Sequence, residues 1–506
     1  MTKQLKTSNL NLPSFTALEL PKAVKELIKT LSGYSVEIYL VGGFVRDMFL
    51  GEVSQDLDFI VVNKSTKELG AELAKKHDGN WFTLDEVTET VRFVLKDEDS
   101  LIYTFDFTPV SKSKLEEDFS RRDFTINALA INIKEPDILT DKFSGLEDLK
   151  QKKIKAIKLN NFFDDPLRFV RAFRFACHLQ GEIEEETFSF IKNNLKSFNS
   201  NVAGERISHE IWKILDNENS GRYFKQMADA GLLEIIIPEL TPMRKVTPND
   251  FHHLWLFDHS LELIKTFEEN FNKIPGWAKE ELNKPFGNSE SPKKKAVTKL
   301  GCLLHDVGKP GTWEIKNIDG KEKHTFYGHD KLGEEITKQI SERLKFSNLI
   351  IQSLSSLVRY HLRPFQLSQA NVAITERALY RFFRDVKEDT PLLLMLAMAD
   401  LYATVGPKIT KDDLLNGEKL ILFLFDEYKK YRDHEAEMAK KPKLLDGNEV
   451  MKLTGLKPSP ILGQIMKELD EAIAVGEIKT KKDAEEWVLE RLPAKGGSTS
   501  GGKIEN

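Results

Sequence analysis

Two aspartates separated by a single residue, Asp56 and Asp58, begin a run rich in β-branched side chains that ends at Val62. Alternation along a strand points residues i and i+2 to the same face, so both carboxylates are expected on one face. Two such acids repel each other unless a cation joins them. Mg²⁺ suits the pair because it takes few carboxylates and completes its shell with water and phosphate oxygens. The pattern predicts a divalent-metal site, although an isolated pair also occurs at solvated strand ends.

Paired glycines, Gly42 and Gly43, precede these acids, between a strand-like run and a helix-like run that contains Arg46. Glycines at such a turn let backbone N–H groups approach a phosphate, and the following helix adds positive potential at its N-terminus. A third acid, Asp106, lies in the strand-like stretch from Ile102 to Thr108. The order of these features is more informative than any one of them.

A basic segment, Arg121-Arg122-Asp123-Phe124-Thr125-Ile126-Asn127, completes the series. With it the sequence resembles the class II nucleotidyltransferases, which include bacterial CCA-adding enzymes, their CC-adding and A-adding relatives, and bacterial poly(A) polymerases. The resemblance implies an α+β multidomain chain: a polymerase-β-like head with a mixed sheet and helices, followed by all-α domains.

The resemblance also implies roles for these residues. Asp56 and Asp58 would hold the Mg²⁺ ions of a two-metal in-line displacement, and Asp106 would be the third catalytic carboxylate. The nucleotide-binding residues would include three near the glycine turn and four in the basic segment: Gly42, Gly43, Arg46, Arg121, Arg122, Asp123 and Asn127. For the arginines, the alternative is surface salt bridging.

An acid and an arginine three positions apart, Asp165 and Arg168, follow the head. On a helix they present an acceptor and a rigid donor fork side by side. Cytosine and adenine both offer an amino donor beside a ring-nitrogen acceptor, whereas uracil and guanine offer a carbonyl beside a ring N–H. The pair would therefore accept C and A and leave buried polar groups unpaired against U and G. An ordinary ion pair is the alternative.

The family's nucleotide-selecting motif is normally Glu-Asp followed by Arg, and Asp165 and Arg168 fill its selecting positions, with Asp164 in place of the usual Glu. Arg171 and Arg174 share the same predicted helix and would touch phosphate or brace the helix. The segment from Gly204 to Glu210 resembles a further family motif, for which we expect an architectural role.

Histidines gather in a second region, where seven of the eleven lie between residues 252 and 361. Imidazoles together with carboxylates are good ligands for Mn, Fe, Co, Ni or Zn ions. The adjacent His-Asp pair resembles the core of the HD phosphohydrolase superfamily, and the resemblance implies a ligand set of six: His259, His305, Asp306, His329, His361 and Asp400. Such a site would activate water to attack a phosphoester.

Shifts in composition and pattern suggest six segments, and the family resemblance implies what each would be: an N-terminal arm (1–20), a nucleotidyltransferase head (21–150), a nucleotide-selecting helical neck (151–245), an HD domain (246–410), a C-terminal helical tRNA-binding domain (411–493) and a flexible tail (494–506). Within the head we expect a helix from Pro21 to Leu31. Residues 270–297 are polar, with Pro, Gly and Lys, and predict a surface loop.

The whole chain has the composition of a globular protein, with 40% hydrophobic and 30% charged residues among 506. Its net charge of −5 argues against coating nucleic acid by bulk attraction, but a basic face remains compatible with RNA binding. Two distant cysteines and the lack of a signal-like or membrane-spanning stretch favour the cytoplasm and no membrane partner.

These features predict a CCA-adding tRNA nucleotidyltransferase that uses CTP and ATP, with a second HD phosphohydrolase activity. Enzymes that add only CC or only A share the motifs. A poly(A) polymerase is a further alternative, although such enzymes usually carry a basic tail in place of an HD domain. The alternative from another class is an HD phosphohydrolase whose head only binds RNA. The sequence leaves the oligomeric state open.

Overall fold

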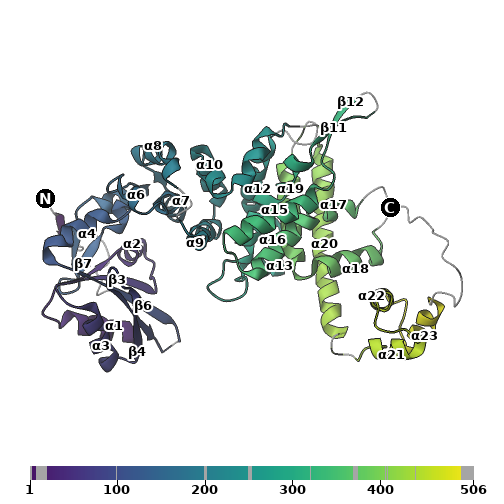
Figure 1. Ribbon diagram of the computed structural model, residues 1–506, viewed down its shortest axis with the longest axis horizontal. Helices are drawn as coiled ribbons and strands as arrows, with labels where there is room; N and C mark the ends of the chain where they lie inside the picture. Colours follow the sequence, from purple (N-terminus) through teal and green to yellow (C-terminus); the bar gives the residue numbers. More distant parts are fainter. Residues whose placement is uncertain are drawn as a thin grey trace. The chain divides into compact units, whose positions relative to one another are not determined.

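The computed structural model describes residues 3–6, 20–98, 100–198, 202–248, 254–318, 321–368, 374–404, 406, 408–438, 440 and 442–491. The chain forms two compact units, Met1–Pro238 and Glu239–Asn506 (Figure 1). The flexible tail expected at 494–506 and most of the N-terminal arm lie outside the described residues.

One eight-stranded mixed sheet forms the centre of the first unit, in the order β1-β8-β7-β2-β3-β6-β5-β4. Its strands are β1 (Lys3–Lys6), β2 (Ile38–Val41), β3 (Asp56–Val62), β4 (Gly79–Asp85), β5 (Thr90–Lys96), β6 (Ile102–Val110), β7 (Ala130–Asn132) and β8 (Ile138–Asp141). Strands β3 and β6 are parallel, and the other neighbouring pairs are antiparallel. The N-terminal arm thus contributes an edge strand.

Strand β3 has an apolar side and an acidic side. Leu57 and Phe59 are buried, and the Phe59 ring stacks on Phe107 of β6 with 5.2 Å between ring centroids. Because neighbours along a strand alternate, burial of these residues turns Asp56 and Asp58 to the opposite face. Core packing therefore fixes the direction in which the carboxylates point.

Five helices accompany the sheet: α1 (Lys22–Ser32), α2 (Gly43–Leu50), α3 (Thr66–Lys76), α4 (Leu115–Arg121) and α5 (Gly145–Lys150). Helix α3 packs on β4, β5 and β6, and α2 packs on β2 and β3. The helix predicted from Pro21 to Leu31 is confirmed as α1, with Val24, Leu27 and Leu31 buried.

A helical segment follows the head within the same unit. It contains α6 (Asn161–Asp164), α7 (Arg168–Leu179), α8 (Glu185–Asn193), α9 (Gly204–Leu215), α10 (Ser220–Ala230) and α11 (Leu232–Ile236), with a short parallel pair of β9 (Lys153–Ile154) and β10 (Glu182–Ile183). Helix α7 packs on α9 and α10, and its buried Phe169 and Phe173 contact the rings of Phe162 and Phe188. Arg168, Arg171 and Arg174 recur every three residues and so share another face.

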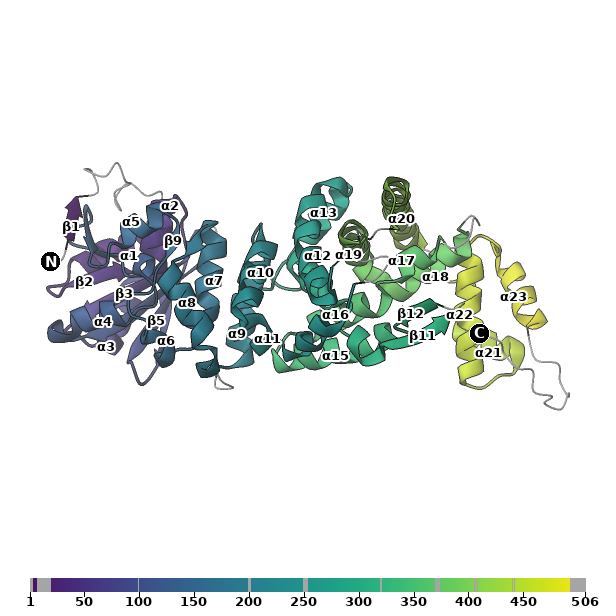
Figure 2. The same ribbon diagram turned by 90° about the horizontal axis from the view of Figure 1, so that it is seen from above.

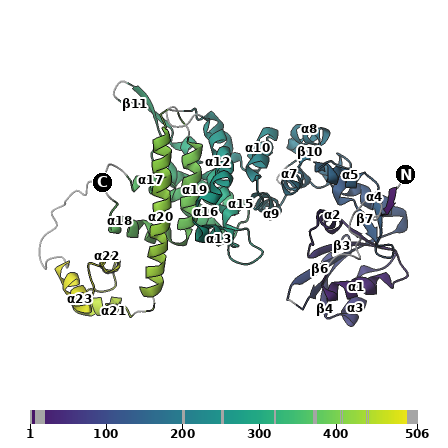
Figure 3. The same cartoon turned by 180° about the vertical axis from the view of Figure 1, so that it is seen from behind.

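The second unit is mainly helical. Its larger part comprises α12 (Leu256–Asn270), α13 (Gly276–Asn283), α14 (Lys294–Leu304), α15 (His329–Arg343), α16 (Asn348–Tyr360), α17 (Arg363–Gln366), α18 (Glu376–Val386), α19 (Thr390–Ala403) and α20 (Lys411–Met438), with a hairpin of β11 (Glu314–Ile318) and β12 (Lys321–Thr325). Helix α19 is apolar on nearly every side and contacts α12, α14, α16 and the long α20 (Figure 3). Such a helix belongs at the centre of a core.

The surface loop predicted over 270–297 is wrong outside residues 284–293, since α13 precedes them and Lys294 begins α14. Residues Gly276–Asn283 form α13, which buries Ala278 and Leu282, while Trp277 packs edge-on against Phe425 with 6.0 Å between ring centroids. Three apolar side chains on one face of two helical turns are enough to dock the segment on the core, and the surrounding Pro, Gly and Lys residues masked that pattern.

Three short helices, α21 (Gly447–Thr454), α22 (Pro460–Ala474) and α23 (Lys481–Glu490), share a small core that includes Val450, Leu469 and Val488. Helix α22 lies beside α18 (Figure 2). There, buried Glu471 accepts hydrogen bonds from Arg381. Among the described helices, none is both long and apolar enough to cross a membrane.

Candidate functional site

Three carboxylates lie close together on strands β3 and β6. Asp58 and Asp106 are direct neighbours in the parallel register, and Asp56 is two residues before Asp58. Thr104 donates a hydrogen bond to Asp56, and Arg92 donates to both oxygens of Asp106 at 2.7 and 2.8 Å. The acids expected to act together are therefore adjacent, and Asp106 is already fixed by an arginine.

Asp58 lies in an electrostatically crowded position. Solvent reaches its side chain, yet the surrounding protein removes enough water to raise its pKa. The charge of Arg122 opposes that rise, whereas Asp106 and Asp56 add to it. A divalent cation at this position would relieve the repulsion among the acids, so the donor set fits the expected Mg²⁺.

The glycine turn lies directly against the carboxylates. Gly42 has φ of +76°, and a Cβ built on it would lie 3.1 Å from Asp58 Oδ2 and 3.2 Å from an Arg122 nitrogen. Gly42 therefore has both a conformational and a steric reason to lack a side chain. Gly43 starts α2, on which Arg46 is buried.

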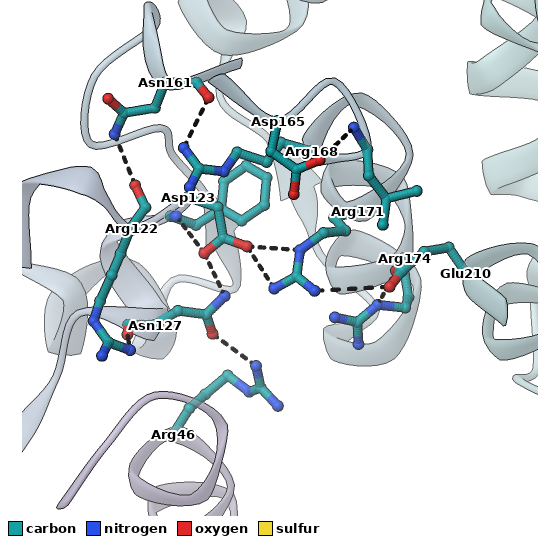
Figure 4. A network of polar contacts seen from close by, with 12 residues as sticks. Arg46, Arg122, Asp123, Asn127, Asn161, Asp165, Arg168, Arg171, Arg174 and Glu210 are labelled. Carbon is teal, nitrogen blue, oxygen red and sulfur yellow. Dashed lines mark hydrogen bonds and ion pairs between the residues drawn. The ribbon is translucent and has the colours of Figure 1, made fainter. Parts of the chain in front are cut away.

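A polar network joins the head to α7 (Figure 4). Arg46 donates to Asn127 Oδ1 at 2.7 Å, and Asn127 Nδ2 donates to Asp123 Oδ1 at 2.9 Å. Asp123 Oδ2 accepts from Arg171 Nε and NH2 at 2.9 and 2.7 Å. Residues from the glycine-turn helix, the basic segment and the helical neck are thus connected through short hydrogen bonds.

Asp123 stays ionised within this network. Burial by itself would raise its pKa, but the charge of Arg171 and the hydrogen bonds from Asn127, Arg171 and the Phe124 N–H lower it to about 2. Burial also lowers the pKa of Arg174 to about 10, against the opposing charge of Glu210, whose carboxylate lies 2.5 Å from Arg174 Nε. Both groups keep their charges at neutral pH.

These groups surround one open pocket of about 400 Å³. It is lined by Gly42, Gly43, Phe44, Arg46, Asp47, Ser54, Asp56, Asp58, Arg122, Asp123, Asn127, Asp165, Arg168, Arg171, Arg174, Phe175 and Lys213. Two expected residues contribute differently. The Arg121 side chain is 65% exposed and does not line the pocket, although its backbone carbonyl accepts a hydrogen bond from Arg168. Asp106, the neighbour of Asp58 on β6, does not line the pocket either.

Asp165 and Arg168 line this pocket without sharing a helix. Arg168 is the first residue of α7, whereas Asp165 lies in the extended turn between α6 and α7. A proline at position 166 disfavours helix at the residue before it, which explains the break. The expectation of one continuous helix is therefore wrong, but both side chains reach the same pocket.

Several residues of α9 contact the pocket groups although the sequence indicated no pocket role for them; two of them lie in the Gly204–Glu210 segment, for which an architectural role was expected. Arg206 on α9 contacts Asp165 Oδ2 at 3.0 Å, and Glu210, one turn further along α9, contacts Arg171 and Arg174. Lys213 on the same helix lines the pocket. Their spacing of three or four residues was a signal that these side chains share one face of α9.

The second unit brings all six expected metal ligands together. They form two groups whose candidate ligand atoms lie within 4.8 Å of one another: His259, His305 and Asp400, and Asp306, His329 and His361. His305 Nε2 lies 3.1 Å from Asp306 Oδ2, so the two groups adjoin. The residues come from α12, α15, α19 and the turns that follow α14 and α16.

Hydrogen bonds on the far side of three imidazoles orient their rings. Nδ1 of His305, His329 and His361 lies 2.7 to 2.8 Å from the carbonyl of the residue three positions earlier. A carbonyl only accepts, so Nδ1 carries the proton and each Nε2 turns a lone pair toward the cluster. This tautomer is the one that binds a cation, and the donor set therefore fits a divalent metal.

Comparison with known proteins assigns the chain to a family. Residues 38–155 match the poly A polymerase head domain, 182–244 match the probable RNA and SrmB-binding site of polymerase A, and 256–404 match the HD domain. The A-adding tRNA nucleotidyltransferase of Deinococcus radiodurans is 31% identical over 458 residues, covering 89% of this chain and 94% of that protein. The chain belongs to the class II tRNA nucleotidyltransferase and poly(A) polymerase family. It is a nucleotidyltransferase with an HD domain.

Other members of this family align over similar lengths. The CC-adding tRNA nucleotidyltransferase of Thermus thermophilus is 28% identical over 462 residues, which cover 90% of this chain and 93% of that protein. The CCA-adding enzyme of Thermotoga maritima, solved in complex with a tRNA, has the same fold, with a TM-score of 0.62 at 20% identity, 97% of this chain and 100% of that chain being covered. The nucleotidyltransferase head and the HD domain both imply the use of divalent metals.

Proposed function

We propose that this nucleotidyltransferase adds C and A, or one of the partial additions CC and A, to the 3′ end of tRNA, taking CTP and ATP and releasing pyrophosphate. One observation carries the proposal: Asp165 and Arg168, whose side chains complement C and A, line the same pocket as Asp56 and Asp58. Base selection and phosphoryl chemistry would then occur on one bound nucleotide.

Asp56 and Asp58 would hold Mg²⁺, with Asp106 completing the acidic cluster. Bound there, the cations would favour ionisation of the RNA 3′-hydroxyl and stabilise the charge on the leaving pyrophosphate. Asp106, fixed by Arg92, lies beside Asp58 in the parallel register of the neighbouring strand.

The protein's own groups would bind the rest of the nucleotide. Gly42 and Gly43 let the backbone approach the triphosphate, and Arg46 and Arg122 supply positive charge beside it. The buried pair of Asp123 and Asn127 would position the sugar, while Arg171 and Arg174 face the same pocket from α7. The exposed Arg121 would act through its backbone carbonyl, which orients Arg168.

Base selection follows from hydrogen-bonding chemistry. Asp165 would accept the amino group of C or A, and Arg168 would donate to the adjacent ring nitrogen. Uracil and guanine present the reverse pattern and would leave both side chains unpaired in the pocket. Family members that add A and members that add CC align along nearly the whole chain, which supports both bases as substrates.

The test uses three tRNA substrates that end at the discriminator base, at C and at CC, each incubated with CTP, ATP, UTP or GTP. The proposal predicts incorporation of C, A or both, with UTP and GTP rejected. Absence of C and A incorporation on all three substrates would contradict it. Unlimited growth with ATP alone would indicate a poly(A) polymerase.

The histidine cluster supports a second activity, hydrolysis of a phosphoester by a metal-activated water. His259, His305, Asp306, His329, His361 and Asp400 would hold Mn, Fe, Co, Ni or Zn ions. Release of phosphate from a cyclic phosphodiester or a phosphorylated RNA end, measured with each metal in turn, tests it. A protein that binds metal here without hydrolysing any of these substrates would contradict the activity.

We also propose the division of labour along the chain. Residues 21–150 would form the catalytic head, 151–245 the nucleotide-selecting neck, 246–410 the HD domain and 411–493 a tRNA-binding domain. The separate small core of α21, α22 and α23 supports a distinct helical module at the C-terminal end of the last of these segments. The two cysteines, Cys177 and Cys302, are far apart in the sequence and show no CxxC spacing, which supports a reducing compartment such as the cytoplasm.

A further inference from the structure

The two base-selecting side chains have opposite charges and lie three positions apart, yet each is held by a different partner. Asp165 Oδ2 lies 3.0 Å from Arg206, and the Arg168 guanidinium donates to the carbonyls of Asn161 and Arg121, both at 2.8 Å. Among the described residues, no ion pair joins Asp165 to Arg168. The structure keeps these two groups apart.

Arg206 reaches Asp165 from a separate helix. It lies in the first turn of α9, and its side chain is 54% exposed beside the pocket. One turn later, buried Glu210 contacts Arg171 and Arg174 of α7. Consecutive turns of α9 thus contact Asp165 and two α7 arginines, and Figure 4 shows Asp165, Glu210 and the α7 arginines close together.

Asp165 also accepts a longer hydrogen bond from the backbone. Its Oδ1 accepts a hydrogen bond of 3.2 Å from the Leu167 N–H within the same turn. Without Arg206, the carboxylate would have an unoccupied oxygen in the same pocket as the Arg168 guanidinium, and opposite charges there attract. A bond between Asp165 and Arg168 would occupy the donor and acceptor atoms that are needed for the base.

We propose that Arg206 is a positioning residue for base selection: by binding Asp165 Oδ2 it prevents the two selecting side chains from pairing with each other. The inference rests on the proposed roles of Asp165 and Arg168 as base-selecting residues. With Arg206 present, the free lone pairs of Asp165 accept the amino group of C or A, and the Arg168 fork stays available for the ring nitrogen.

The experiment compares Arg206→Ala and Arg206→Lys with the unmodified full-length protein. We expect Arg206→Ala to raise KM for CTP or ATP by about 10- to 100-fold, the range of a lost charge-assisted hydrogen bond, with a smaller change in kcat. Preference for CTP over UTP should fall by a similar factor. Arg206→Lys retains the charge and should restore most of both quantities.

Arg222→Ala is the matched control, because Arg222 makes an exposed ion pair with Glu182 in the same helical segment and does not line the pocket. Unchanged nucleotide KM and unchanged discrimination in Arg206→Ala would overturn the inference. So would a rise confined to the KM for tRNA, which would indicate a phosphate contact, or a uniform loss that follows a lower Tm. If the unmodified protein added neither C nor A, the proposed function itself would fail, which is a separate result.

Discussion

Arg171 directs two nitrogens, Nε and NH2, at one oxygen of Asp123, at 2.9 and 2.7 Å across 48 positions of sequence. This contact joins the basic segment of the head to α7, which begins at Arg168 and also carries Arg174. Asp123 also holds Asn127, which in turn accepts from Arg46 near the glycine turn. Residues of α2, the basic segment and α7, which line one pocket, are therefore connected through a single buried carboxylate.

Asp123→Asn should lower the free energy of unfolding of the first unit by about 3 kcal/mol at pH 7, because it removes the nearer of the two buried counter-charges of Arg171 and leaves only Glu210, 3.7 Å away. The pKa of Asp123 is about 2 in the folded protein, below its usual 3.8. Its stabilisation is thus fully present above about pH 3.8 and is lost as the pH falls toward 2. Denaturant unfolding of both proteins between pH 3 and 7 should show a gap that narrows below about pH 4.

Glu182→Gln provides the comparison for that experiment, since it removes an exposed ion pair with Arg222 in the same unit. Its effect should stay below about 1 kcal/mol. A gap between Asp123→Asn and the unmodified protein that stays constant down to pH 3 would show that Asp123 is not held ionised by its neighbours.

Gly42→Ala should reduce nucleotide addition by about tenfold or more, whereas Gly43→Ala should be nearly neutral. At Gly42 an added Cβ meets Asp58 at 3.1 Å and the backbone φ of +76° strains any L-residue by about 1–2 kcal/mol. At Gly43 the nearest atom is the end of a flexible arginine, 3.6 Å away. Steady-state kinetics with CTP and ATP measure the difference, and equal effects at both glycines would count against the close approach of the turn to Asp58.

Asp56→Ala should abolish nucleotide addition, with a loss of about 10³-fold or more, because it removes one of two carboxylates on the proposed metal face. Asp56 is exposed and makes few contacts, so the fold should tolerate the change. Hydrolysis by the HD cluster in the other unit should continue unchanged. Retained tail addition would instead support a head that only binds RNA.

His361→Ala should lower the amount of transition metal bound per chain and abolish phosphoester hydrolysis, while leaving nucleotide addition intact. His361 Nε2 lies 3.2 Å from His329 Nε2 and 3.5 Å from Asp306, so its loss removes a donor from the centre of the cluster. Elemental analysis of the purified protein measures the metal. His434→Ala, on α20 away from the cluster, is the matched control and should keep a full complement.

Chemistry-bearing residues were largely predictable from the sequence, because strand alternation and short spacings dictate which side chains share a face. Asp56 and Asp58 on one strand face, and the six histidine-cluster residues, are found as expected. The turn at Asp165 was not, although Pro166 carried the signal that a continuous helix would be interrupted.

The sequence could not predict which side chains from distant elements would pair with the site residues. Arg92 on β5 binds Asp106, and Arg206 on α9 binds Asp165, across 14 and 41 positions. Local sequence periodicity does not predict which of many arginines will face a given acid, because tertiary packing determines the pairing. The docking of α13 was missed for the same reason: three apolar residues suffice when a complementary core is present.

We propose that one pocket selects C and A through Asp165 and Arg168 and transfers them at Asp56 and Asp58. The most direct measurement is single-nucleotide extension of tRNAs ending at the discriminator base, C and CC, by the unmodified protein and by Asp165→Ala. We expect the unmodified protein to add C, A or both, and the variant to lose its preference for CTP and ATP over UTP and GTP. Unchanged base preference in Asp165→Ala, with nucleotide addition intact, would contradict it.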